Sequence, residues 1–336
     1  MDFRFKYALA LVVYSLCLFG CKPASSSKML SDKSVPAEIQ LGDLNRCEKY
    51  SGLPQDWLKH QYSGMVKISA GEFKLGSNQA YADEFNFGAP IRKVDEFWID
   101  QTEVTVAQFA SFVQATNYVT DAEKQQEAAV FSPDSKQPHQ WWKLKSGYTW
   151  QYPNGTGKEK AQANEPVRFV TQNDAARYAL WLGRDLPTEI EWEYAAKAGG
   201  LEDTPLHQAP TDHQQRPIAN YWQGEFPFQN LKQDQFESVA PVGCFQANAF
   251  GIYDQIGNVW EWTNSVYQGA HDQHMGDYQS LRKNQQSHPN YVIKGGSYLC
   301  AQNYCSRFRN SSRYPQELDL ATSHVGFRTI SRIKDQ

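Results

Sequence analysis

The sequence lacks an excess of basic residues, the motifs of several common enzyme classes and an apolar run long enough to span a bilayer. Its 33 Lys and Arg are outnumbered by 37 Asp and Glu, and a net charge of −4 gives no basic stripe, so nucleic-acid binding is not expected. No Gly-rich phosphate loop, Gly-x-Ser-x-Gly elbow or His-Glu-x-x-His motif occurs, which argues against the corresponding sites. The 336 residues, 40% of them hydrophobic, suffice for a full globular core.

The N-terminal segment has the features of an export signal. Arg4 and Lys6 precede an apolar run from Tyr7 to Phe19, which is too short for a membrane-spanning helix of the mature protein. The run closes on Leu18-Phe19-Gly20-Cys21, a pattern similar to a bacterial lipobox in which Cys21 carries the lipid. Because Phe19 is bulkier than the small residue usual at that position, ordinary signal cleavage is the alternative.

A Ser- and Pro-rich stretch follows Cys21 and has little to bury, as expected of a flexible tether. Lys22, in place of an acidic residue after Cys21, favours the outer membrane of a Gram-negative cell. We therefore predict a signal peptide at residues 1–20, a tether at 21–45 and one domain at 46–333. The protein is expected to be exported and lipid-anchored to the bacterial envelope, facing the periplasm.

Export changes what the cysteines can do, because disulfides persist in an oxidising compartment. Cys17 is removed with the signal and Cys21 is used for the lipid. Three pairings are possible for the remaining thiols. We expect a structural disulfide that ties the start of the domain to its middle. The remaining cysteines are Cys47, Cys244, Cys300 and Cys305, and the expected disulfide joins the first two.

The first half of the domain carries strand and helix signals. Short alternating stretches predict strands. Two capping boxes, at Thr105 and Thr188, and a helical apolar period after Thr171 predict three helices. Beyond residue 200 almost no helical period is present, and Gly, Pro, Asn and Asp separate short aromatic runs. The predicted strands are 65–68, 71–75 and 97–99, and the predicted helices begin after Thr105, Thr171 and Thr188, the last of them ending at Gly199-Gly200. So much irregular backbone needs a cross-link or an ion to hold it.

Cys300 and Cys305 can meet only if the chain turns between them. On a helix their side chains would diverge by about 140°, and on a strand they would face opposite sides. Gln302-Asn303 is suitable turn chemistry, and Gly295-Gly296 allows close approach of the backbone. Two thiolates without nearby His or further Cys suit Cu(I) better than tetrahedral zinc. From the spacing alone, however, a plain disulfide is the favoured interpretation.

Several stretches together resemble one family, the formylglycine-generating enzymes or sulfatase-modifying factors. In family order they cover about residues 63 to 330, which is nearly the whole expected mature chain. The resemblance implies an α+β fold, the C-type-lectin-like fold of this family, with low regular secondary structure and long loops. The stretches are GEFKLGS (71–77), FWIDQTEVTVAQFASFVQATNYVTDAE (97–123), GRDLPTEIEWEYAAKAGG (183–200), NYWQGEFP (220–227), GNVWEW (257–262), KGGSYLCAQNYC (294–305) and GFR (326–328).

The resemblance implies a copper-dependent oxidase. Cys300 and Cys305 would bind Cu(I), and the enzyme would use O2 and a reductant to convert a cysteine in Cys-x-Pro-x-Arg segments of an unfolded client sulfatase to formylglycine. Ser297 and Tyr304 match family residues beside the oxygen and the substrate thiol. Trp260 matches an aromatic wall of the substrate pocket, and Arg313 matches a residue that orients the peptide. A monomer is expected.

One departure from the family pattern concerns the residues between the cysteines. Ala301-Gln302-Asn303 lacks the His that many members carry after the first cysteine, which affects tuning of substrate or oxygen handling but removes no copper ligand. Two other functions stay open: a noncatalytic envelope-assembly lipoprotein of the same fold, and an oxidase acting on another small peptide or a siderophore-type substrate. Retention of both thiols counts against the first of these.

The resemblance also implies two structural Ca²⁺ sites, because calcium takes carboxylate, amide and carbonyl oxygens. The alternative for the second site is that its two acidic residues merely cap turns. The first site would use the side chains of Asn220 and Asp234 with the carbonyls of Tyr221 and Phe236, and the second the side chains of Asp254 and Glu261 with the carbonyls of Gly257 and Val259.

Overall fold

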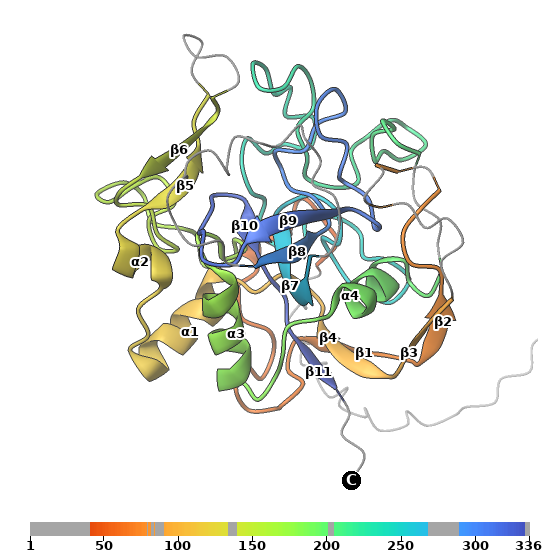
Figure 1. Ribbon diagram of the computed structural model, residues 1–336, viewed down its shortest axis with the longest axis horizontal. Coiled ribbons are helices and arrows are strands. Elements are labelled where there is room, and N and C mark those ends of the chain that lie inside the picture. The colour runs from red at the N-terminus through yellow and green to blue at the C-terminus, as the bar shows by residue number, and fades with distance from the viewer. Residues whose placement is uncertain are drawn as a thin grey trace, which may run out of the picture. The chain divides into compact units, whose positions relative to one another are not determined.

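The computed structural model describes residues 41–78, 80–81, 84, 91–133, 140–200, 205–267 and 289–332 (Figure 1). The predicted signal peptide, most of the tether, and with them Cys17 and Cys21, lie outside the described residues. Within the described part of the chain, no helix combines the length and apolarity needed to cross a bilayer.

The largest sheet lies at the centre of the domain and contains four strands in the order β10-β7-β8-β9 (Figure 1). β10 runs parallel to β7, whereas β8 runs antiparallel to both β7 and β9. The register places Glu261 opposite Lys294 and Ile293 opposite Tyr314. These strands are β7 (Trp260–Val266), β8 (Asn290–Lys294), β9 (Arg313–Glu317) and β10 (Val325–Gly326).

A second sheet and two hairpins account for the other strands. The second sheet is antiparallel in the order β1-β4-β11 and joins the start of the domain to its end. The predicted strands at 65–68 and 97–99 are present in it, and the predicted strand at 71–75 is shorter than expected. The bounds are β1 (Met65–Ile68), β2 (Gly71–Phe73), β3 (Arg92–Val94), β4 (Phe97–Asp100), β5 (Ala128–Phe131), β6 (Trp142–Lys145) and β11 (Ile330–Arg332).

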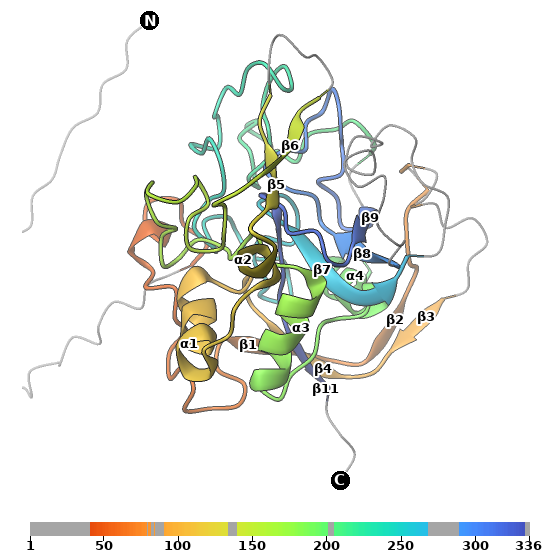
Figure 2. The same cartoon turned by 60° about the vertical axis from the view of Figure 1, so that its left-hand side comes forward.

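Three helices begin where the sequence predicts, after Thr105, Thr171 and Thr188, and a short helix after Thr120 lies outside the prediction. In each case the Thr hydroxyl accepts a backbone N–H at the third helical position and that residue's side chain reaches back to the Thr amide. α1 packs against α3, and α3 packs against β7 (Figure 2). The described helices are α1 (Val106–Thr116), α2 (Asp121–Gln125), α3 (Gln172–Trp181), α4 (Glu189–Ala196) and the short 3-10 helix η1 (Cys47–Lys49). α4 ends about a turn before the predicted glycines.

Large rings fill the main core between α1, α3 and the central sheet. Phe109 stacks on Tyr178 with ring centroids 5.9 Å apart, and Phe327 meets the Tyr178 ring edge-on at 5.3 Å. Trp262 is fully buried, and its indole N–H donates to the Val170 carbonyl at 3.0 Å. The same apolar cluster includes Cys300 and Cys305, so the predicted site lies against the core.

Residues 205–259 form neither a helix nor a named strand, which agrees with the predicted loss of regular structure after residue 200. This part of the chain is held by other means. The expected disulfide is present: Cys47 and Cys244 are bonded and almost completely buried. At Gly257 the chain has a φ of +79°, and a Cβ there would lie 2.2 Å from the Asn220 carbonyl oxygen, so only glycine fits where the two loops meet.

Removing the disulfide should destabilise the fold, because the bridge closes a loop across a sequence separation of 197. For Cys47→Ala together with Cys244→Ala we expect the free energy of unfolding to fall by about 2–5 kcal/mol. Urea unfolding of the variant and of the wild type, with and without reductant, measures this. Cys300→Ser is the control that keeps the bridge. Equal stability of the double variant and the wild type would contradict the role given to the bridge.

His324 should make the fold sensitive to acid. Its side chain is buried beside the Trp142 ring at 4.6 Å, and burial lowers the pKa of His324 from 6.5 to about 3. Between those values the unfolded chain takes up a proton that the folded protein does not, so stability falls as pH falls from 6.5 towards 3. For His324→Gln we expect the slope of unfolding free energy against pH to decrease by about 1.4 kcal/mol per pH unit in urea titrations between pH 6 and 4. An unchanged slope in His324→Gln would contradict this role for the buried imidazole.

Candidate thiol-pair active site

Cys300 and Cys305 lie side by side, buried and not bonded to each other. Their sulfur atoms are 3.5 Å apart, and the two residues are 1% and 9% exposed. The chain turns between them, as convergence requires: the Ala301 amide donates to the Cys305 carbonyl at 3.1 Å, and the Tyr304 amide donates to the Ala301 carbonyl at 3.2 Å. The geometry is that of two free thiols and not of the plain disulfide that the spacing alone favoured.

The backbone before the turn approaches its neighbours very closely. Gly296 has a φ of +82°, and a Cβ there would lie 2.3 Å from the Arg307 carbonyl oxygen. On the Cys300 side the Trp222 amide donates to the Cys300 carbonyl at 2.9 Å, which ties the turn to the helix-free loops. Ser297 is fully buried, and its backbone amide donates to the Cys300 sulfur at 3.4 Å. Ser297 therefore contacts the thiol pair through its main chain.

The two thiols have different acidities because they share a hydrogen bond. Burial raises the pKa of Cys300, but the Cys305 thiol and the Ser297 amide donate to its sulfur and Arg307 lies nearby, so the net pKa is lowered. The same hydrogen bond and burial raise the pKa of Cys305. Cys300 is therefore the thiol of the pair that loses its proton first, and Cys305 keeps its proton longer.

Aromatic rings surround Tyr304 at the exposed end of the turn. Tyr304 is 37% exposed and stacks on Phe226 with centroids 4.8 Å apart, while Trp141 meets Tyr304 edge-on at 4.9 Å. Trp222 packs edge-on against Phe226 at 5.1 Å. We call Trp141, Trp222, Phe226 and Tyr304 the aromatic group. Trp222 and Phe226 lie in the stretch NYWQGEFP, but the sequence assigns neither of them a role, and Trp141 lies in none of the motifs.

Trp260 and Arg313 are less open to a ligand than the sequence predicts. Trp260 belongs to the same core cluster as the thiols but is only 1% exposed. Arg313 forms an ion pair with Glu189, with a closest distance of 2.7 Å, and its guanidinium lies 4.5 Å from the Tyr267 ring centroid. A role in binding the peptide stays a prediction for both residues.

The first predicted calcium position has converging oxygen atoms. The side-chain amide nitrogen of Gln223 donates to the Tyr221 carbonyl and, at 2.7 Å, to Asp234 Oδ2. Two of the predicted ligand oxygens, the Tyr221 carbonyl oxygen and Asp234 Oδ2, thus face the same point, which the Gln223 amide nitrogen occupies. Asp234 is almost fully buried, and burial raises the pKa of its carboxyl group. The Phe236 amide donates to Asp234 Oδ1 at 3.0 Å, and the Asn220 side-chain amide donates to the Ser238 carbonyl at 2.9 Å.

The second predicted calcium position is organised differently. Both carboxylate oxygens of Glu261 accept from Arg328 at 2.7 Å, and the Trp192 indole donates to one of them at 2.7 Å. Burial raises the pKa of Asp254 to about 6, and Glu103 lies in the same cluster with one carboxylate oxygen that has no hydrogen-bond partner. Both oxygens of Glu261 are therefore paired with the Arg328 guanidinium. The predicted ligands that remain for a calcium ion are the Asp254 carboxylate and the carbonyls of Gly257 and Val259.

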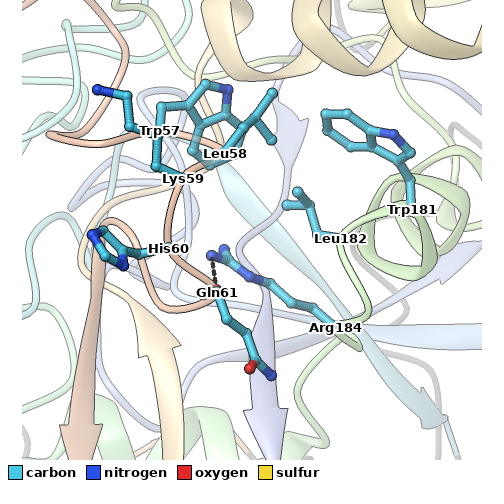
Figure 3. Close-up of a pocket in the computed structure, with 8 residues that line it drawn as sticks. All are labelled: Trp57, Leu58, Lys59, His60, Gln61, Trp181, Leu182 and Arg184. Carbon is cyan, nitrogen blue, oxygen red and sulfur yellow. Dashed lines mark hydrogen bonds between the residues drawn. The ribbon is translucent and has the colours of Figure 1, made fainter.

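A surface pocket of about 270 Å³ lies elsewhere, between the segment 57–61 and the residues that end α3 (Figure 3). Arg184 lines it and donates through one guanidinium nitrogen to the Gln61 carbonyl at 2.8 Å and through the other to Asp100 at 2.8 Å. None of the residues predicted to form the active site lines this pocket, so it is not the candidate active site. Its lining residues are Trp57, Leu58, Lys59, His60, Gln61, Trp181, Leu182 and Arg184.

Comparisons with known proteins agree with this architecture. The family described as "Sulfatase-modifying factor enzyme 1-like domain" matches residues 50–333. The chain is 39% identical over 302 residues to a protein of Mycobacterium tuberculosis named formylglycine-generating enzyme, covering 80% of this chain and 97% of that protein. It is 36% identical over 282 residues to the Mus musculus protein of the same name, covering 79% and 74% of the two chains.

The similar proteins also include one whose name describes it as inactive. A Bos taurus protein called inactive C-alpha-formylglycine-generating enzyme 2 is 34% identical over 289 residues, covering 81% of this chain and 89% of that one. Among solved structures, PvdO from Pseudomonas aeruginosa has the same fold, with a TM-score of 0.55, 21% identity and coverage of 80% and 94%. The family match and the identities establish that this chain belongs to the formylglycine-generating enzyme, or sulfatase-modifying factor, family.

Proposed function

We propose that this protein oxidises a cysteine in Cys-x-Pro-x-Arg segments of client sulfatases to formylglycine and so activates them. The observation that carries the proposal is the pair of buried, unlinked thiols 3.5 Å apart. Relatives named formylglycine-generating enzyme at up to 39% identity support it. A chain that served only as a scaffold would gain nothing from keeping two reactive sulfur atoms side by side in its core.

The donor atoms of the thiol pair fit Cu(I). Two soft sulfur ligands with no third Cys, His, Asp or Glu grouped beside them, within the described part of the chain, suit a monovalent ion that accepts low coordination. Bound copper would supply the one-electron and oxygen chemistry that side chains cannot perform. O2 and an external reductant complete the proposed reaction.

The chain's own residues would bind the peptide and exclude water. Cys300 and Ser297 are buried against the core, so bulk water is kept from the pair, and the exposed approach is past Tyr304. The aromatic group around Tyr304 offers flat apolar surface for the proline of the client segment. Glu225, an exposed residue that accepts from the Asn303 side chain at 3.2 Å, lies near enough to the turn to meet the arginine of that segment.

We further propose export and a lipid anchor at Cys21. The buried Cys47–Cys244 disulfide supports export, since such bonds persist in oxidising compartments. The clients would then be unfolded exported sulfatases, met by a monomer at the membrane surface. The two other functions, an envelope-assembly lipoprotein and an oxidase for a different small substrate, share the fold, and the second also shares the site.

An aldehyde assay tests the proposal. The full chain loaded with Cu(I) should form formylglycine on a Cys-x-Pro-x-Arg peptide under air, read by mass spectrometry and hydrazide labelling. Because each thiol supplies a metal ligand, Cys300→Ser or Cys305→Ser should lower the rate by about 10³-fold or more. The matched control is Cys47→Ala with Cys244→Ala, which removes two sulfurs away from the site and should keep activity below its melting temperature.

The outcomes separate the three functions. Turnover retained by Cys300→Ser would refute the roles given to the thiols. No turnover by copper-loaded wild type on this peptide, but oxidation of another thiol peptide, would favour the different oxidase. Absence of copper binding by the reduced wild type would favour the noncatalytic lipoprotein.

We propose calcium only for the first of the two predicted positions, where the Tyr221 and Asp234 oxygens converge on the Gln223 side-chain amide, whose place the ion would take. Removing the ion by chelation should lower the melting temperature by about 5 °C, because binding to the folded state alone stabilises it. In scanning calorimetry Asp234→Asn should abolish this difference. Asp212→Asn, at an exposed turn, is the control and should retain it. An unchanged melt after verified removal of the ion would contradict the proposal.

A further inference from the structure

The residue after Cys305 is held at both of its backbone groups by side chains from outside the thiol turn. The Ser306 amide donates to the Tyr81 hydroxyl at 3.1 Å, and the Ser306 carbonyl accepts from Arg309 Nε at 2.9 Å. Ser306 is fully buried. The position of the Cys305 side chain therefore depends on contacts made by Tyr81 and Arg309, because a rotation at Ser306 would move the preceding Cα–Cβ bond.

A buried carboxylate joins the two arginines that follow Cys305. Glu84 accepts from Arg307 at 2.8 Å through Oε1 and from Arg309 through Oε2. All three side chains are at most 2% exposed. Removing one partner from a buried ion pair leaves an uncompensated charge, so this bridge resists displacement. It connects positions more than 220 residues apart in the sequence.

Tyr81 and Glu84 act as one unit. The Glu84 amide donates to the Tyr81 carbonyl at 2.8 Å, and the Tyr81 amide donates to Glu84 Oε2 at 3.3 Å. The guanidinium of Arg307 lies 4.4 Å from the Tyr81 ring centroid, and that of Arg309 lies 5.6 Å from it. The ring thus packs against the same cations that the carboxylate pairs with.

We propose that Tyr81 and Glu84 are positioning residues, which fix the Cys305 end of the thiol pair and hold the two sulfur atoms as unlinked thiols. We call these two residues the second anchor, the first being the Trp222 amide that holds the Cys300 carbonyl. Neither residue touches the reacting atoms; both act through Ser306 and the two arginines. The catalytic meaning of the second anchor rests on the proposed function, whereas its effect on the thiols does not.

The second anchor is needed because the turn has no regular structure of its own. It is closed by two internal backbone hydrogen bonds, to the Cys305 and Ala301 carbonyls. The Tyr81 hydroxyl, like an ordinary tyrosine hydroxyl, is protonated and neutral near neutral pH. A neutral oxygen can accept a hydrogen bond from the Ser306 amide without placing a negative charge near the two sulfur atoms.

The test compares Tyr81→Phe with a matched variant in the full chain. Tyr194→Phe also removes one hydroxyl that bonds a backbone group, the Ser69 carbonyl at 3.2 Å, but in a separate core cluster. Metal-free protein is equilibrated with glutathione redox buffers, free thiols are alkylated, and the Cys300–Cys305 peptide is quantified by mass spectrometry. In this exchange the two thiols lose two hydrogens to oxidised glutathione, which becomes two reduced molecules.

For Tyr81→Phe we expect the ratio of disulfide to dithiol to rise about threefold to tenfold, the effect of one lost hydrogen bond. The Cu(I) affinity, measured by competition with a chromophoric chelator, should fall by about the same factor. Tyr194→Phe should change neither quantity, even where its melting temperature falls equally. Glu84→Gln leaves a guanidinium without its carboxylate and should raise the disulfide ratio further. If Glu84→Gln does not fold, the result for Tyr81→Phe alone decides the inference.

An unchanged disulfide ratio in Tyr81→Phe would overturn the inference, as would an equal shift in Tyr194→Phe. The redox readout uses neither metal nor substrate. A shifted ratio in a protein whose wild type forms no aldehyde would therefore refute the proposed function and leave the second anchor standing. If the wild type forms the aldehyde but Tyr81→Phe leaves the disulfide ratio unchanged, the proposed function stands and the role of the second anchor is refuted.

Discussion

Buried arginine side chains connect segments of this protein that lie far apart in the sequence. Arg184 links Asp100 to the Gln61 and Ser63 carbonyls, and Arg328 links Glu261 to the Asp100 and Tyr253 carbonyls. Arg307 and Arg309 share Glu84 in the same way. A planar guanidinium with five donors can satisfy several loop carbonyls and a carboxylate at once, which a lysine cannot. In a domain with so little regular structure, these side chains supply the hydrogen bonds that sheets supply elsewhere.

The thiol pair shows what this construction makes possible. A strand or a helix would have separated Cys300 from Cys305, whereas an irregular turn brings their sulfurs to 3.5 Å. The irregular turn has no regular backbone hydrogen-bond pattern of its own to hold the two sulfur atoms at that distance. Its two ends are fixed from different parts of the chain, by the Trp222 amide before the turn and by Tyr81 and Arg309 after it. The reactivity of the pair is therefore a property of the surrounding loops as much as of the cysteines.

Much of the fold could be predicted from the sequence where the physics is local. The Thr105, Thr171 and Thr188 boxes mark helix starts because hydroxyl and carboxylate or amide groups within four residues satisfy the free N–H groups. The ends were harder: α4 stops at Ala196, before the predicted glycines, because tertiary contacts decide how the last turn is capped. Trp260 and Arg313 were expected to face a ligand, yet one is in the core and the other is paired with Glu189.

The sequence by itself determined three of the helix starts, the lack of helices among the described residues after 200, the identity of the thiol pair and the family. Each of these depends on neighbouring residues or on motifs in a fixed order. Only the tertiary structure decided that the two thiols are unlinked, that Glu261 pairs with Arg328, and that Tyr81 and Glu84 reach the turn after Cys305. The contacts of Glu261 and of Tyr81 join residues 67 and 225 positions apart. Spacing along the chain carries no information about such distances, and which charge meets which partner is settled only when the loops pack and exclude water.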